Sequence, residues 1–304
     1  MQNKFDVIII GGSYAGLSAA MALGRSLRNV LVIDSGKPCN RQTPHSHNFL
    51  TQDGNTPKEI SDLSKEQVLK YDTVKFYEGT VIKISKTDEG FEIATEHHEK
   101  LYAEKIILAS GVKDIMPDIE GFSECWGISV IHCPYCHGYE VKGKTTGILS
   151  NGDMAFEFSK IVFNLTKDLT LFTNGMSTLT PEQAERFNQN KIRIVEDEID
   201  KVIHKNGQIQ KLIFKNGKEF PLEALYAKIA FEQNINPGDL NLEMTEHGFI
   251  NIDHFHKTNV EGVFACGDNV SMMRSVANAV AQGNMSGAIV NRELSVEEFS
   301  SFPE

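Results

Sequence analysis

Apolar runs alternate with glycine turns and amphipathic segments along the chain, and this alternation predicts a mixed α/β fold. Phe5–Ile10 forms an apolar run that is typical of a strand buried on both faces. A glycine turn over residues 11–16, a helix over Leu17–Ser26 and a strand over Val30–Ile33 follow it. This order of strand, turn, helix and strand is a βαβ unit.

The pattern then predicts a polar loop over residues 36–56, a helix over 57–71 and strands over 74–77, 81–85, 91–95 and 106–109. A second βαβ unit follows, with strands over 146–149 and 169–173 flanking a turn at 150–152 and a helix over 154–164. Strands and helices are expected to keep alternating to about residue 231. A polar linker over 233–247, a strand over 263–265 and a helix over 276–294 complete the pattern.

Composition excludes several classes of function. The chain has 304 residues, enough for two domains, and a net charge of -11 without a Lys/Arg cluster, which argues against nucleic acid as a partner. We expect no signal peptide and no membrane span, since no apolar run reaches about 18 residues. An odd number of cysteines, five, argues against a disulfide framework and predicts a reduced, cytoplasmic setting.

The first glycine turn has the features of a dinucleotide site. Gly11 allows a tight turn after the strand, and Gly16 allows close helix packing. Ser13 replaces the usual second glycine, but it is small, and Gly12 beside it adds backbone freedom. Asp34 ends the second strand, where a carboxylate would bind a ribose hydroxyl. The alternative is a strand, turn and helix that bind no ligand.

The second candidate feature is the Cys133-Pro-Tyr-Cys136 pair, flanked by His132 and His137. Two cysteines at this spacing can close a small disulfide, and a neighbouring histidine can move the thiol proton. Zinc is the competing interpretation, but zinc ligands usually come from two separated pairs, and the chain has no second Cys-x-x-Cys. We therefore predict a redox pair and no metal, with incidental packing of the two cysteines as the remaining alternative.

The order of these motifs resembles low-molecular-weight thioredoxin reductases, flavoproteins of the class II pyridine nucleotide-disulfide oxidoreductases. The resemblance rests on the glycine turn, Ala109-Ser110-Gly111, the cysteine pair, the second βαβ unit and the segment 262–268. It implies two Rossmann-like, three-layer nucleotide-binding domains, the second inserted in the first. An FAD-binding domain would comprise residues 1–117 plus 246–304, and an NAD(P)H-binding-like domain would comprise 118–245. It also implies a homodimer, and a thioredoxin-like protein or a small dithiol or disulfide as partner.

The resemblance also implies a set of cofactor-binding residues. The glycine turn would hold the FAD pyrophosphate, Asp34 the adenosine ribose, and Asp268 the ribityl chain. Asn48 would lie near the flavin, Val81 near the adenine and the segment 274–276 near the flavin pyrimidine edge. The full set of candidates is Gly11, Gly12, Ser13, Ala15, Gly16, Asp34, Asn48, Val81, Ala109, Gly111, Gly267, Asp268, Arg274, Ser275 and Val276.

Two departures leave the electron donor open. Ser150, Asn151 and Gly152 stand where the family has three glycines, and Thr173-Asn174-Gly175 stands where it has a His-Arg-Arg that grips NADPH. NADPH use therefore remains undecided. A ferredoxin- or flavodoxin-linked reductase would also lack that site.

The residue after the cysteine pair leaves the direction of electron flow open. His137 replaces the family's aspartate, and this resembles flavin-dependent dithiol oxidases that use oxygen as acceptor. In the reductase direction, Cys133 would attack the partner disulfide, Cys136 would face the flavin and His137 would shuttle the proton. The oxidase direction would run these steps backwards, with a dithiol substrate oxidised by the Cys133–Cys136 pair. An alternative outside the enzymes is a non-catalytic, flavin-binding redox sensor.

Overall fold

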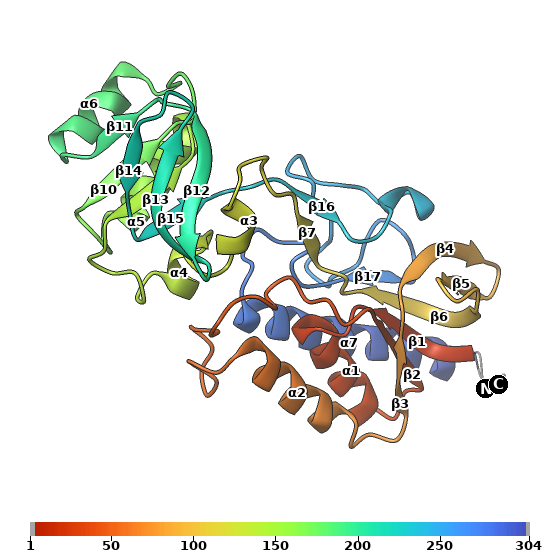
Figure 1. The fold of residues 1–304 in the computed structure, drawn as a ribbon. Coiled ribbons are helices and arrows are strands. Elements are labelled where there is room, and N and C mark those ends of the chain that lie inside the picture. Colours follow the sequence, from red (N-terminus) through yellow and green to blue (C-terminus); the bar gives the residue numbers. More distant parts are fainter. Residues whose placement is uncertain (1–3, 302–304) are drawn as a thin grey trace.

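The chain forms two lobes, each built on its own sheet (Figure 1). This computed structural model describes residues 4–301. We call the elements from α3 (Phe122–Cys125) to β15 (Ala224–Ala227) the small lobe, and the elements before and after them the large lobe. Both sheets contain parallel strands and both lobes are of the Rossmann type, which confirms the predicted α/β fold class.

The large lobe contains a seven-stranded sheet in which the first two predicted strands lie at the centre. β1 and β2 are parallel and almost wholly buried, as their apolar sequences require. β5 pairs with the first half of β6, and β17 pairs with its second half. The strand order is β3 (Val74–Glu78), β2 (Val30–Asp34), β1 (Lys4–Ile10), β6 (Lys100–Leu108), β5 (Gly90–Thr95) and β4 (Val81–Thr87), with β17 (Val263–Ala265) beside β6.

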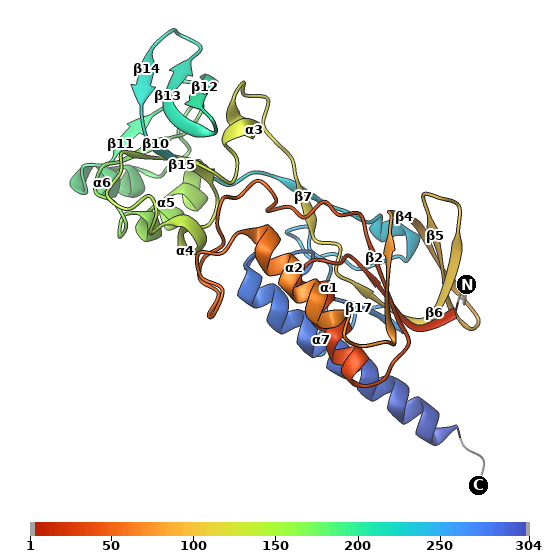
Figure 2. The ribbon, with the colours of Figure 1, turned by 60° about the horizontal axis from the view of Figure 1, so that its bottom comes forward.

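Successive residues of β1 face opposite sides of this sheet and enter two separate cores. Val7 and Ile9 pack under the helices α1 (Tyr14–Arg25), α2 (Pro57–Val68) and α7 (Val276–Ser300). Figure 2 shows these three helices side by side. Ile8 and Ile10 pack on the other face, against β4, β5 and the segment that carries Leu240. The large lobe therefore has three layers.

The small lobe repeats this arrangement around a five-stranded parallel sheet. Its order is β11 (Arg193–Val195), β10 (Leu169–Phe172), β9 (Thr146–Leu149), β15 and β8 (Val130–Ile131). The helices α5 (Gly152–Val162) and α6 (Pro181–Gln189) cover one face. The antiparallel strands β12 (Ile199–Lys205), β13 (Gln208–Phe214) and β14 (Glu219–Pro221), together with α3, cover the other.

Several elements differ from the sequence prediction. The alternation of strands and helices does not continue to residue 231, because β12, β13 and β14 form a meander. Asn206 and Gly207, both with positive φ, make the tight turn that joins its first two strands. The strand expected from residue 106 begins at Lys100, where alternating exposed and buried residues match antiparallel pairing with β5.

Two short strands connect the lobes. The chain leaves the large lobe after β7 (Val112–Asp114) and returns at β16 (Phe231–Gln233), and these strands pair antiparallel. A 3-10 turn, η1 (Pro237–Asp239), follows, and Leu240 and Leu242 then pack in the large-lobe core. We therefore propose that the insertion ends between Ala227 and Phe231, and not at residue 245 as the sequence analysis placed it. Among the helices of residues 4–301, none is long and apolar enough to cross a membrane.

Candidate active site

A cavity of about 850 Å³ lies at the carboxyl ends of the large-lobe strands and reaches the small lobe. Gly11, Asp34, Ala109 and Gly267 line it at, or within two residues of, the carboxyl ends of β1, β2, β6 and β17. Ligands of open parallel sheets bind at this edge, and the volume is within the range of roughly 300–1,000 Å³ for ligand sites. Side chains of α4 (Pro134–His137) and its flanks line the other side.

The glycine turn at one end of the cavity is shaped to leave a helix terminus open. A Cβ on Gly16 would lie 1.8 Å from the Gly11 carbonyl oxygen, so only glycine permits this approach. Among the described side chains, none caps the first turn of α1, whose N-cap is Ser13, and that turn carries no acidic residue. The free N–H groups and the positive end of the helix dipole suit a diphosphate.

Asp34 is held beside this turn by backbone hydrogen bonds. The amide of Gly12 donates to Oδ1 at 3.0 Å, and the amide of Gly36 donates to Oδ2 at 3.2 Å. These bonds orient the carboxylate at the cavity edge, where its remaining lone pairs can accept from hydroxyl groups. The turn, the helix terminus and this carboxylate together fit the diphosphate and ribose of a dinucleotide.

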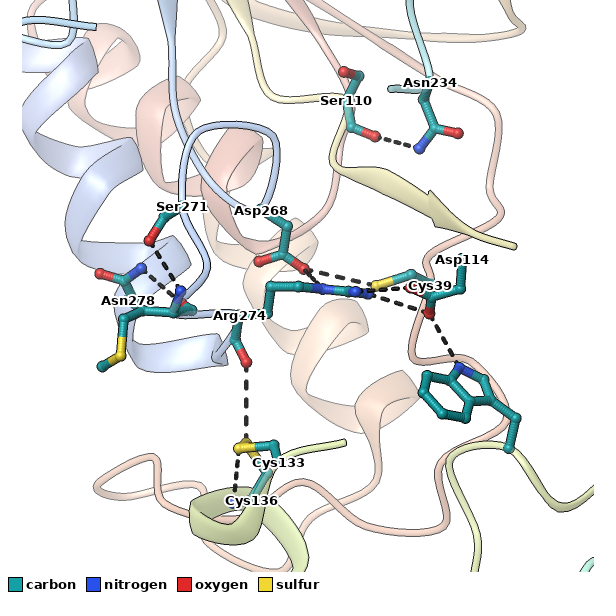
Figure 3. Close-up of polar contacts among 12 residues, drawn as sticks. Cys39, Ser110, Asp114, Cys133, Cys136, Asn234, Asp268, Ser271, Arg274 and Asn278 are labelled. Atoms are coloured by element: carbon teal, nitrogen blue, oxygen red, sulfur yellow. Dashed lines mark hydrogen bonds and ion pairs between the residues drawn. A yellow bond between two sulfur atoms is a disulfide. The ribbon is translucent and has the colours of Figure 1, made fainter. Parts of the chain in front are cut away.

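An ion-pair network occupies the other end of the cavity, at the start of α7 (Figure 3). Arg274 donates to Asp114 Oδ1 at 2.7 Å and Oδ2 at 3.2 Å, and its Nε lies 3.4 Å from Asp268 Oδ2. Burial raises the pKa of Asp268, while the charge of Arg274 acts in the opposite direction. Cys39 Sγ lies 3.8 Å from the same Asp268 oxygen, and burial raises the pKa of this thiol to about 11.

The two predicted redox cysteines form a disulfide beside the cavity. Cys133 is the N-cap of α4, and its sulfur accepts a hydrogen bond from the Cys136 amide at 3.2 Å. Cys136 lines the cavity, and its sulfur lies 4.0 Å from the Arg274 carbonyl oxygen (Figure 3). The disulfide and the glycine turn thus border one continuous space.

Both flanking histidines also line the cavity. Burial lowers the pKa of His137, with Glu140 raising it and His47 lowering it further, so the imidazole is neutral at neutral pH. Burial lowers the pKa of His132 to about 4, and the charge of Arg274 adds to this effect. His132 stacks on Trp126, and its Nε2 is buried without a hydrogen-bond partner among the described residues. An unpartnered buried nitrogen facing a cavity fits a polar ligand there.

The structure brings most of the predicted site residues together. The following line the large cavity: Gly11, Ser13, Ala15, Asp34, Val81, Ala109, Gly111, Cys136, His137, Gly267, Asp268, Arg274, Ser275 and Val276. Gly12, Gly16 and Cys133 do not line it, but each is next in the chain to a residue that does. Asn48 lies instead at a second cavity, of about 290 Å³, together with His47, Asp53, Tyr135, Tyr139 and Glu140.

Sequence reasoning did not assign several residues that line this cavity, among them Cys39, Asp114, Trp126 and His132. His132 was noted only as a neighbour of the cysteine pair. Asp114 offered one usable signal, because it is a carboxylate that closely follows a strand-end glycine.

The second βαβ unit differs from the first at the N-terminus of its helix, α5, which corresponds to the N-terminus of α1. Asn151 Oδ1 accepts from the amide of Gly152 at 2.9 Å and from the amide of Thr178 at 2.9 Å. Asp153 adds a negative charge in the first turn of α5. The chain's own side chains therefore occupy the helix terminus that would receive a diphosphate, and their charge disfavours one.

Comparisons with known proteins agree with this geometry. A family model described as pyridine nucleotide-disulphide oxidoreductase matches residues 5–283. The chain is 34% identical to thioredoxin reductase tcpT of Claviceps purpurea, over 96% of this chain and 95% of that protein.

Two solved structures are similar throughout. The putative thioredoxin reductase TrxB of Bacillus anthracis has a TM-score of 0.92 and 30% identity, covering 97% of this chain and all of that one. An oxidoreductase of Agrobacterium tumefaciens has a TM-score of 0.90 and 34% identity, covering 96% of this chain and 99% of that one.

Proposed function

The chain belongs to the pyridine nucleotide-disulphide oxidoreductase family as a thioredoxin reductase-like enzyme, and from this we propose an FAD-dependent dithiol/disulfide oxidoreductase. Its working redox pair would be Cys133 and Cys136. One observation supports this most strongly: the Cys136 sulfur borders the same cavity as the glycine turn. A dinucleotide that extends from α1 along this cavity would reach the disulfide.

The chain's own residues would hold FAD from two helix ends. The first turn of α1 would bind the diphosphate and Asp34 a ribose hydroxyl, because these groups offer free donors and a fixed carboxylate. Asp268 and the first turn of α7 would bind the flavin half. FAD would supply a group that accepts or donates an electron pair beside the disulfide.

The thiol chemistry would follow from the positions of the two sulfurs. A substrate thiolate attacks the Cys133–Cys136 bond at Cys133, forms a mixed disulfide there and releases Cys136 as a thiolate. The second substrate thiol then displaces Cys133, which leaves an oxidised substrate and a reduced cysteine pair. Neutral His137 would take the proton from a reacting thiol. The reverse sequence would reduce a partner disulfide.

A second candidate is a dithiol oxidase in which oxygen is the final electron acceptor. The observation that favours it is the occupied N-terminus of α5, where Asn151 and Asp153 disfavour the diphosphate of NADPH. The overall reaction would convert one dithiol and one O₂ into one disulfide and one H₂O₂. A thioredoxin-like protein or a small dithiol would be the partner, and a cytoplasmic homodimer the working form.

Anaerobic mixing of the yellow holoenzyme with possible donors tests both candidates. NADPH, NADH, reduced ferredoxin and a dithiol are each added, and flavin bleaching is followed by absorbance. Bleaching by a dithiol, lost in Cys136→Ser and retained in Cys125→Ala, would support the proposed pair; Cys125 is a buried thiol in the small-lobe core. Fast bleaching by NADPH would reject the oxidase candidate. Wild-type bleaching that survives Cys136→Ser would reject the proposed function.

A further inference from the structure

Asp114 joins the two lobes through a single buried carboxylate. It ends β7, the strand after which the chain enters the small lobe. On one side it accepts the paired hydrogen bonds of Arg274, and on the other Oδ2 accepts from Trp126 Nε1 at 3.0 Å. Only 8% of the Asp114 side chain is exposed, so this contact is shielded from water and salt.

Arg274, in the large lobe, contacts both Asp114 and the disulfide. Its guanidinium binds Asp114, and its carbonyl oxygen lies 4.0 Å from Cys136 Sγ (Figure 3). A paired Arg–carboxylate contact is directional as well as strong, so it fixes the orientation of the arginine. The position of Asp114 therefore helps to set the position of the backbone that contacts Cys136.

Trp126 connects Asp114 with the disulfide through contacts within the small lobe. Its ring stacks on His132, with ring centroids 5.7 Å apart, and His132 directly precedes Cys133. Phe122 stacks on the tryptophan with ring centroids 5.9 Å apart. Two separate series of contacts thus connect Asp114 with the disulfide. One runs through Arg274 to Cys136, and the other runs through Trp126 and His132 to Cys133.

We propose that Asp114 is a positioning residue that holds the Cys133–Cys136 disulfide beside the cavity. The proposal rests on the proposed function, in which the disulfide exchanges electrons with a group bound in that cavity. Such exchange needs close approach, and a displacement of about 1 Å can slow a reaction by roughly 100-fold. Asp114 lines the cavity, and its side chain hydrogen-bonds to Arg274 and Trp126, through which it acts on the disulfide.

The test is Asp114→Asn, which keeps the shape of the side chain and removes its charge. Asp268 remains near Arg274, so the guanidinium keeps an acidic partner. The matched control is Glu232→Gln, which breaks the exposed ion pair between Lys113 and Glu232 on the same two connecting strands. Trp126→Phe is a second variant that keeps the ring stacking but cannot donate to Asp114.

Two readouts are measured. The first is the limiting rate of flavin bleaching at saturating dithiol, which we expect to fall roughly 10- to 100-fold in Asp114→Asn and not in the control. The second is acrylamide quenching in the protein without flavin. Trp126 is the only tryptophan and is buried. Its quenching by acrylamide should therefore increase if the small lobe separates from the large lobe and exposes the ring to solvent. We expect stronger quenching in Asp114→Asn alone.

The outcomes separate this proposal from the proposed function. A wild-type limiting rate and wild-type quenching in Asp114→Asn, or an unchanged rate in Trp126→Phe, would overturn the positioning role. If the flavin of the wild-type protein exchanges no electrons with the cysteine pair, both the proposed function and the positioning role fail. Quenching of the flavin-free protein would then still show whether Asp114 holds the lobes together.

Discussion

The carbonyl oxygen of Arg274 lies 4.0 Å from Sγ of Cys136, although 138 residues separate them in the chain. The contact is not a hydrogen bond, because a disulfide sulfur carries no proton. It places the start of α7 in the large lobe against α4 in the small lobe. The surroundings of the disulfide therefore depend on how the two lobes pack.

Asp34→Ala should weaken FAD binding. The substitution removes the acceptor for the amides of Gly12 and Gly36 and the proposed partner of the ribose. Hydrogen bonds to a charged group are worth about 1.5–3 kcal/mol, so we expect the dissociation constant to rise roughly 10- to 100-fold. Titration of the apoprotein with FAD measures this. Asp6→Ala is the control, because Asp6 also accepts a backbone amide, but at the other end of β1; equal affinities in both variants would contradict the assignment.

His137→Gln should remove the acid limb from the pH profile of flavin bleaching by a dithiol. Burial lowers the pKa of His137, so the neutral, proton-accepting imidazole prevails at pH 7 and is lost as the pH falls through this lowered pKa. The variant should be slower by roughly 100-fold or more on the plateau. His97→Gln, at an exposed position, is the control. An unchanged acid limb in His137→Gln would show that another group carries it.

His132→Gln should reduce the loss of folding stability that accompanies a fall in pH below neutrality. Burial lowers the pKa of His132 to about 4, whereas an unfolded histidine has a pKa near 6.5. The unfolded chain therefore binds this proton first, and stability is lost as the pH falls from about 6.5 towards 4. Between pH 7 and pH 5 the loss should be smaller in the variant by about 2 kcal/mol. Urea unfolding followed by Trp126 fluorescence measures it. His247→Gln, which is exposed, should behave as the wild type; a similar pH dependence in His132→Gln would refute the prediction.

Gly283→Ala should destabilise the contact between α1 and α7. A Cβ at this position would lie 2.0 Å from the carbonyl oxygen of Ala15, so the helices would have to separate. Overpacking of this kind costs about 1–3 kcal/mol. Thermal denaturation should show a lower midpoint, and flavin release should accompany it because Ala15 lines the cavity. Asn284→Ala changes the adjacent, exposed position and should not lower the midpoint. Equal midpoints for the two variants would contradict this account.

The elements that the sequence predicted best are those whose pattern reflects local physics. β1 and β2 were recognisable because strands buried on both faces need apolar residues throughout. The turn between β1 and α1 was recognisable because Gly16 has no room for a Cβ. The first half of β6 was missed, since its alternating residues depend on β5 as an antiparallel neighbour. The β12–β13 turn was overlooked although Asn206-Gly207 is a strong hairpin signal.

Sequence alone determined which groups are available for the proposed chemistry: a cysteine pair at disulfide spacing, a histidine beside it and a glycine turn suited to a dinucleotide. It also showed that Asn151 replaces a glycine, but only the structure showed its amide filling the end of α5. Likewise, only tertiary structure decided that Asp114, Trp126 and Arg274 meet beside the disulfide. These residues lie on different lobes, and their contacts arise from packing over long sequence distances, which no local pattern of residues encodes.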